Sequence, residues 1–162
     1  IMSSDWSSDV CSSDLGRAPV LVSQILKGKG AQVVDIERHR SIRDAAQLMI
    51  QHGIGAVLVR DGGGICGILS ERDIARGVAN DGESAARAAV ETLMSVDVVS
   101  CAPTDKTDDL MTLMTNRRIR HLPVMAGGEL VGMISIGDIV KARLGELESH
   151  SEALQTYISG SI

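Results

Sequence analysis

Two short stretches of the sequence carry one pattern of residues that could do chemistry. The first reads GILSERDI at 67–74 and the second reads GMISIGDI at 132–139, so glycine, serine and aspartate recur at the same spacing. At a helix start, backbone N–H groups and the helix dipole attract an anion, and a serine hydroxyl can donate to a phosphate oxygen. An aspartate one turn later can accept from both hydroxyls of a ribose. The candidates for such contacts are Ser70 with Asp73 and Ser135 with Asp138.

A simpler role for the same residues is a capping box. In it, a serine N-cap and an acidic residue three positions later satisfy the first N–H groups of a helix. A single occurrence would favour this interpretation. The two occurrences lie at equivalent places in an internal duplication, and that favours ligand binding.

The duplication is visible when the chain is aligned with itself at an offset of 65 residues. Val33-Val34 then falls on Val98-Val99, and Asp73-Ile74 falls on Asp138-Ile139. Helical spacing of apolar residues, β-rich runs and glycine turns predict a strand, a helix, a hairpin and a second helix in each copy. The expected elements are first strands at 32–36 and 97–101, helices starting near Ser41 and Thr104, hairpins at 56–69 and 122–134, and helices after Ser70 and Ser135. An apolar lead-in precedes each copy, at 22–26 and 90–94, and Gly28-Lys29-Gly30 lengthens the first.

These elements predict an α/β (α+β) fold of two tandem β-α-β-β-α units, related by a pseudo-two-fold axis. Such a pair creates two clefts between strands and helix N-termini. We expect the units at 20–82 and 88–146, followed by a C-terminal helix at 147–162. Residues 1–16 contain repeated Ser-Ser-Asp triplets, and this low complexity predicts a non-native or disordered tail.

The two patterns, with RRIRHLPVM at 117–125 and the order of elements, resemble the cystathionine-β-synthase (CBS) domain family as one tandem pair, or Bateman module. The resemblance covers residues 20–146 and is greatest to short stand-alone bacterial proteins. It implies a non-enzymatic regulatory module that binds AMP, ADP, ATP, S-adenosylmethionine or NAD(H) and signals to an unidentified regulated protein. By position it places Ser70, Asp73, Ser135 and Asp138 at phosphate and ribose. Around the base it places Val33, Val34, Ile54, Gly55, Ala56, Val98, Val99, Ile119, Arg120 and His121, with Pro123 close by.

The two copies differ at one of these stretches. Gly55-Ala56-Val57-Leu58 of the first stands where the second has Arg120-His121-Leu122-Pro123. We therefore expect two clefts with unequal affinity or different ligands. The basic residues that could reach a phosphate are Arg72, Arg117, Arg118 and Arg120. The last three could instead complement the dipole at a helix C-terminus.

Composition excludes several kinds of partner. The net charge is −5 and no block of basic residues stands out, which argues against nucleic acid. No apolar run approaches the ~20 residues that a membrane helix needs. The three cysteines lack CxxC spacing, which favours reduced thiols in a cytoplasmic protein. Trp6 and Tyr157 are the only aromatic residues, so aliphatic side chains must hold a bound base.

Three functions stay open from the residues alone. They are an adenine-nucleotide sensor, a structural homo-oligomerising scaffold with vestigial clefts, and an enzyme such as a nucleotide hydrolase or a redox protein that uses Cys66. Intact serine–aspartate pairs argue against the scaffold, and the histidines and cysteines lack catalytic or metal-ligand spacing, so no metal is expected. The GxGxxG match at 62–67 precedes a β-rich run rather than a helix, which favours a hairpin turn.

The end of the sequence carries an apolar stripe at heptad spacing. Its members are Val140, Leu144, Leu147, Ser151, Leu154 and Ile158. Such a stripe packs either against a second copy or back on its own domain. We expect a homodimer with Leu147 and Leu154 at the contact, because CBS pairs commonly meet through helices.

Overall fold

The computed structural model describes residues 19–159, with side-chain surroundings for residues 19–149. In chain order its elements are α1 (Val22–Lys29), β1 (Asp35–Glu37), α2 (Ile42–His52), β2 (Ala56–Asp61), β3 (Gly64–Ser70), α3 (Glu71–Asp81), α4 (Thr107–Arg117), β4 (His121–Ala126), β5 (Glu129–Ser135) and α5 (Ile136–Ser159). Short 3-10 helices, η1 (Gly82–Arg87) and η2 (Val90–Thr92), connect the halves. The expected tail at 1–16 lies outside the described residues.

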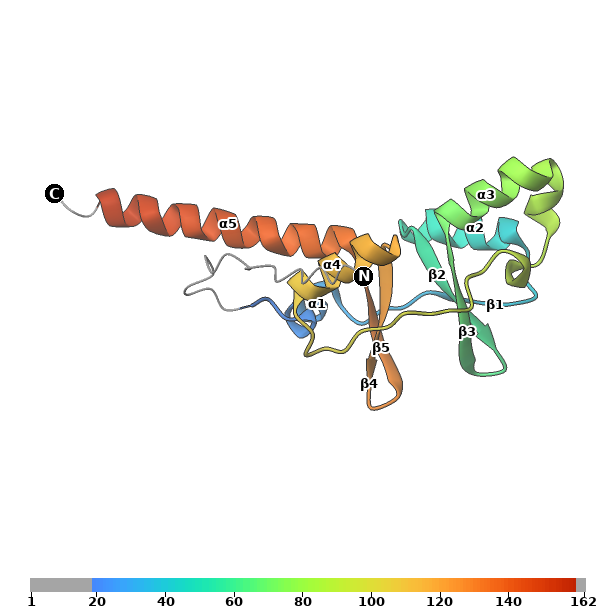
Figure 1. Ribbon diagram of the computed structural model, residues 1–162, viewed down its shortest axis with the longest axis horizontal. Coiled ribbons are helices and arrows are strands. Elements are labelled where there is room, and N and C mark those ends of the chain that lie inside the picture. Colours follow the sequence, from blue (N-terminus) through green and yellow to red (C-terminus); the bar gives the residue numbers. More distant parts are fainter. Residues whose placement is uncertain (1–18, 160–162) are drawn as a thin grey trace, which may run out of the picture.

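The predicted α/β fold of two repeated units is confirmed, and Figure 1 shows the units side by side. In the first unit β2 pairs in parallel with β1 and antiparallel with β3. In the second, β4 and β5 form an antiparallel hairpin. Gly62 and Gly63 have φ values of 61° and 120° in the turn between β2 and β3. The GxGxxG match is therefore a hairpin turn, as predicted.

Each unit has its own apolar core because helix and hairpin present apolar faces to each other. In α2, Ile42, Ala45 and Met49 are buried at the predicted helical spacing. They pack with the buried strand residues Val57, Val59 and Leu69. The second core repeats this arrangement with Leu110, Met114, Leu122, Val124 and Ile134.

The expected strand at 97–101 is wrong, since only a single bridge joins Cys101 to Val124. In the first unit the equivalent ladder is extended by Leu58 N–H donating to the Val34 carbonyl at 3.3 Å and by Arg38 N–H donating to the Arg60 carbonyl at 3.0 Å. At the same positions of the second copy stand Pro123 and Pro103, which have no N–H. The two prolines therefore reduce the parallel strand to one bridge.

The helix expected to start near Thr104 begins instead at Thr107. The Asp105 carboxylate accepts a hydrogen bond from Ala102 N–H at 2.8 Å, and Asp105 N–H donates back to the Ala102 carbonyl at 3.1 Å. This turn occupies the residues that would have formed the first helical turn. In the first copy, by contrast, α2 begins next to Ser41 as predicted, and Ser41 caps it by accepting from Asp44 N–H at 3.1 Å.

The lead-in segments cross between the units, which corrects the expectation that each belongs to the unit it precedes. Val22 of α1 is buried in the second core, and its N–H donates to the Asp105 carbonyl at 3.0 Å. Val90 of η2 is buried in the first core, and its N–H donates to the Arg40 carbonyl at 2.8 Å. Asp105 and Arg40 are equivalent in the duplication, so the exchange obeys the pseudo-two-fold relation. Each unit is thus completed by a segment from the other.

The C-terminal helix is continuous with the last helix of the second unit. The sequence predicts a separate helix at 147–162, but α5 runs without a break from Ile136 to Ser159, and Figure 1 shows it extending beyond the two units. Near its start, Arg143 bonds to Asp108 of α4. None of the helices over 19–159 has the length and apolarity needed to cross a membrane.

Candidate functional site

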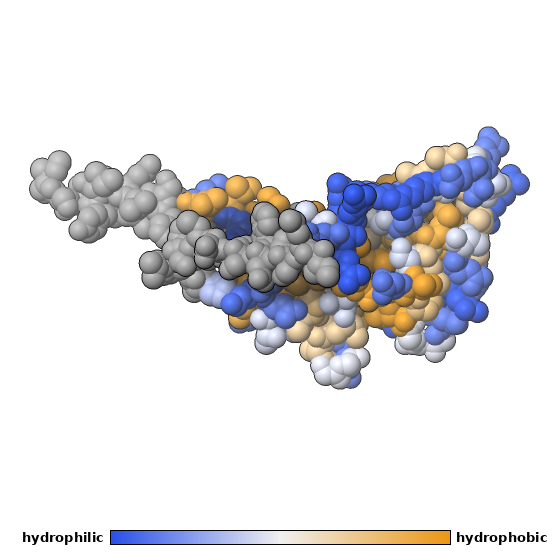
Figure 2. Space-filling view, in the orientation of Figure 1, coloured by the Kyte–Doolittle hydropathy of each residue, from blue (hydrophilic) through white to orange (hydrophobic). Residues whose placement is uncertain are grey.

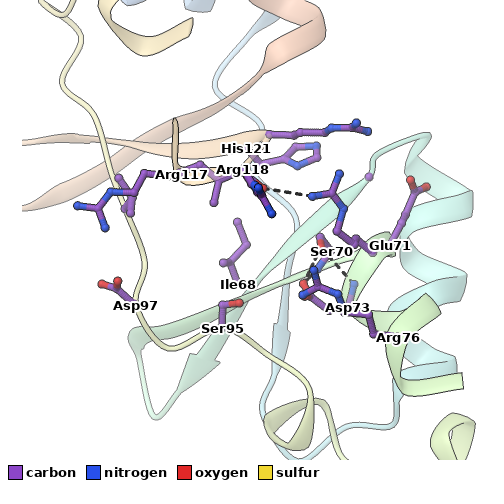
Figure 3. A pocket seen from close by; sticks show the side chains of 15 residues that line it. Ile68, Ser70, Glu71, Asp73, Arg76, Ser95, Asp97, Arg117, Arg118 and His121 are labelled. Carbon is purple, nitrogen blue, oxygen red and sulfur yellow. Dashed lines mark hydrogen bonds between the residues drawn. The ribbon is translucent and has the colours of Figure 1, made fainter. Parts of the chain in front are cut away.

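A cleft of about 470 Å³ lies between the two units. From the first unit, Ser70, Asp73 and Arg76 line it where β3 passes into α3. From the second, residues 117–121 line it where α4 passes into β4. Figure 3 shows these two groups on opposite sides of the cleft. Both units therefore contribute to one site.

The serine–aspartate pair of the first pattern forms the capping box that the sequence predicts. Ser70 is the N-cap of α3, and Asp73 Oδ2 accepts from Ser70 N–H at 2.9 Å and from Ser70 Oγ at 2.5 Å. Asp73 N–H donates to Ser70 Oγ at 3.4 Å. Because the box faces the cleft, capping and ligand binding are compatible roles for this pair.

Half of the residues proposed for the ligand line this cleft. They are Gly55, Ser70, Arg72, Asp73, Val99, Ile119, Arg120 and His121. The others are not among its lining: Val33, Val34, Ile54, Ala56, Val98, Pro123, Ser135 and Asp138. Ala56 and Pro123 are buried within β2 and β4, and Val34 and Ile54 pack against the first core. Packing does not exclude a role at a ligand, since Val99 and Ile119 pack against the second core and also line the cleft.

The structure also adds residues that the sequence interpretation missed. They are Ile68, Glu71, Arg76, Ser95 and Asp97. Arg117 and Arg118, which the sequence offers as phosphate contacts or as partners of a helix dipole, also line the cleft. Arg76 lies one helical turn after Arg72, so its spacing could have revealed it. Ser95 and Asp97 follow the second lead-in in a segment, here called the crossing segment, where Ser95 pairs with Ile68 of β3. No local pattern in the sequence places this segment at the cleft.

Comparison with known proteins decides the family. The model of the CBS domain matches residues 31–80 and 90–145. The chain belongs to the CBS domain family. The resemblance drawn from the two patterns is thereby confirmed.

Related proteins agree with this membership. The CBS domain-containing protein YhcV of Bacillus subtilis is 34% identical over 123 residues, which cover 76% of this chain and 86% of YhcV. The crystal structure of the CBS-domain protein ATU1752 from Agrobacterium tumefaciens is 43% identical with a TM-score of 0.75, covering 76% of this chain and 99% of that one. The CBS domain pair of protein MJ0100, solved in complex with 5′-methylthioadenosine and S-adenosyl-L-methionine, is 25% identical with a TM-score of 0.67, covering 76% and 98%.

His121 of this CBS pair lies where the two units meet. A Cβ atom on Gly55 would be 3.3 Å from both His121 Cε1 and Glu71 Oε2, so the glycine allows a close approach. Burial, the largest effect, and the nearby Lys29 and Arg120 charges lower the pKa of His121, while Glu71 and Asp138 oppose them. The imidazole is therefore mostly neutral at pH 7 and can accept a hydrogen bond.

The second serine–aspartate pair of the CBS pair has different surroundings. Asp138 Oδ2 accepts from Ser135 N–H at 2.7 Å and Ser135 Oγ at 2.9 Å, as in the first pair. It also accepts a hydrogen bond from Lys29 Nζ at 2.6 Å. Lys29 is one of the three residues that lengthen the first lead-in. Burial raises the pKa of Asp138, but the bonds from Lys29 and Ser135 outweigh it, so the pKa is lowered overall. Lys29 therefore contacts the same carboxylate oxygen that accepts from Ser135.

The two described cysteines differ in burial. Cys101 is buried, and burial, helped by Asp105, raises the pKa of its thiol to about 12. The half-buried Cys66 donates from Sγ to the Val59 carbonyl at 3.5 Å. A protonated, buried thiol is a poor nucleophile, which agrees with a packing role for Cys101.

Proposed function

We propose that this CBS pair is a non-catalytic regulatory module that binds an adenine nucleotide, such as AMP, ATP or NAD(H), in the cleft between its units. The observation that carries the proposal is the cleft itself, which sets the Ser70–Asp73 box opposite Arg118 and His121. Asp73 accepts from the ribose, Ser70 and the arginines bind phosphate, and aliphatic Ile68, Val99 and Ile119 hold the base. The adenosyl ligands solved with the MJ0100 CBS pair support an adenosine-containing ligand.

Signalling follows from the composition of the cleft. Its lining comes from the first unit, from the crossing segment that carries Ser95 and Asp97, and from the second unit. A ligand that contacts all three favours one relative position of the units over others. Bound nucleotide therefore changes the shape that the pair presents to a regulated protein. Turnover of ATP or NADH by the purified chain would instead favour the enzyme alternative.

The first prediction is stabilisation by adenine nucleotides. At ~0.3 kcal/mol per non-hydrogen atom, AMP binds with a Kd near ~10 μM. A nucleotide at 100-fold excess over Kd adds about 2.7 kcal/mol to the free energy of unfolding. The Tm should therefore rise by ~5–10 °C in differential scanning fluorimetry.

Guanine nucleotides are the control for this measurement and should give smaller shifts. Native mass spectrometry of freshly purified protein identifies any nucleotide that co-purifies. If no adenine nucleotide shifts the Tm at millimolar concentration, the sensor proposal fails and the scaffold alternative is favoured.

The long helix α5 supports assembly into a homodimer. Val140, Leu144 and Leu147 share one face by their spacing and are 44%, 55% and 55% exposed. Figure 2 shows hydrophobic surface over this part of the molecule. A helix that extends beyond its own units does not cover this face itself, so we infer that a second copy does. The side chains of Leu154 and Ile158, which continue the stripe, lie outside the described residues.

The second prediction tests this dimer. Leu144→Asp combined with Leu147→Asp places charges on the apolar face and should convert a dimer of twice 17.1 kDa to a monomer. Light scattering coupled to size exclusion measures the mass. Ser149→Asp, on the opposite side of α5 by helical spacing, is the matched control and should leave the dimer intact. A wild-type protein that is monomeric at micromolar concentration would refute the interface.

A further inference from the structure

The duplication relates three arginines of the cleft to glycines in the other copy. At an offset of 65 residues the pairs are Arg72 with Gly137, Arg118 with Gly53 and Arg120 with Gly55. All three arginines line the cleft between the units. These three positive charges are therefore not part of the repeated pattern, whereas Arg76 and Arg117 of the lining have Lys141 and His52 as their equivalents.

Arg118 occupies a backbone conformation that favours glycine. Its φ and ψ are 55° and 34°, at the C-cap of α4, and Gly53 at the C-cap of α2 has 61° and 37°. Over residues 19–159, Arg118 is the only residue other than glycine with a positive φ. A Cβ atom makes this conformation unfavourable, so glycine at this position would make the end of the helix more stable. The arginine side chain therefore has a role beyond ending the helix.

The cleft carries more positive charge than its own acids neutralise. Five arginines line it: Arg72, Arg76, Arg117, Arg118 and Arg120. Within the described part of the chain, none of these five appears in an ion pair, whereas Arg38, Arg40 and Arg60 each bond a carboxylate. Asp73 is already bonded by Ser70.

Arg72 and Arg118 are also held together. Arg72 Nη1 donates to the Arg118 carbonyl at 3.3 Å, and this bond brings the end of α4 against α3 across the cleft. Two positive charges that line one cleft without a carboxylate partner among the described residues repel each other. A ligand with several negative charges would relieve that repulsion.

We propose that Arg118, with Arg72, forms a subsite for the terminal phosphates of a nucleoside di- or triphosphate. Guanidinium groups bind phosphate oxygens bidentately and remain charged at all physiological pH values. The cleft therefore prefers ADP or ATP to AMP, adenosine or the cationic S-adenosylmethionine. This inference rests on the proposed function and specifies the ligand class of the same cleft.

The test compares nucleotides by calorimetric titration without divalent cations. Wild-type protein should bind ATP about tenfold more tightly than AMP, since each charge-assisted bond to a terminal phosphate contributes substantially to affinity. Arg118→Gly should lose most of that preference, because the affinity for ATP falls by a larger factor than the affinity for AMP, and it should melt no lower than wild type because glycine suits the backbone. Arg118→Lys should keep part of the ATP preference. Arg43→Ala, which removes one exposed charge from α2 outside the cleft, is the matched control.

The outcomes separate this subsite from the proposed function. If no adenine nucleotide binds wild-type protein, the proposed function itself fails. If AMP and ATP bind equally well, the nucleotide site stands and the terminal-phosphate subsite is overturned. An Arg118→Gly variant that loses AMP and ATP affinity by the same factor, or that keeps full ATP preference, also overturns it.

Discussion

Replacement of Asp73 by alanine should weaken adenine-nucleotide binding at least ~20-fold, because it removes the acceptor of two ribose hydroxyls. Each hydrogen bond to a charged group contributes ~1.5–3 kcal/mol. The contacts from Ser70 all reach Oδ2 of Asp73, so the carboxylate can cap α3 and still face a ribose in the cleft. Calorimetric titration with AMP and ATP measures the loss.

The control for Asp73 must remove a similar helix cap that does not line this cleft. Asp44 provides it, because Ser41 and Asp44 form the same capping box at the start of α2. Asp44→Ala should cost ~1 kcal/mol of stability and leave nucleotide affinity unchanged. Asp138→Ala should likewise leave the first cleft working. If Asp73→Ala merely lowers stability, as Asp44→Ala does, then the pair is only a cap.

The features predicted correctly from the sequence are those encoded over a few neighbouring residues. The capping pairs depend on a serine and an aspartate three residues apart, and the hairpin depends on Gly62 and Gly63 between two β-rich runs. The duplication strengthened each of these by showing it twice. The shortened parallel ladder needed more, since Pro103 and Pro123 remove donors whose partners are known only once the strand register is known.

The composition of the site was less accessible from the sequence because it depends on contacts between distant segments. The lead-ins were assigned to the wrong units, so Ser95 and Asp97 were not expected in the cleft. The pairing of Lys29 with Asp138 joins residues far apart in the chain. No local pattern signals such a contact, although the lengthened first lead-in marked the place where the two copies differ.

The crossing of the lead-ins also explains the glycine of the repeated pattern, and it predicts a large loss of stability for Gly67→Val. A Cβ atom on Gly67 would lie 2.6 Å from Met94 Sδ and 3.0 Å from the Ser95 carbonyl oxygen. The backbone cannot simply move away, because Ile68 and Ser95 exchange hydrogen bonds of 3.0 and 2.9 Å. We expect the variant to lose ~3 kcal/mol of stability and its Tm to fall by ~6–12 °C in thermal denaturation.

Valine substitutions at two other glycines are the controls for this loss of stability. Gly64→Val, in the same strand, has nothing within 4 Å of the added Cβ and should be nearly neutral. At Gly132 the added Cβ meets only the Leu26 side chain, at 2.7 Å, and a side-chain end can move, so Gly132→Val should fall between the two. If Gly67→Val has the same Tm as Gly64→Val, then the segment at Met94 and Ser95 does not pack tightly against β3. If it keeps its stability but loses nucleotide affinity, Gly67 instead serves the ligand directly, as its place in the pattern with Ser70 and Asp73 would allow.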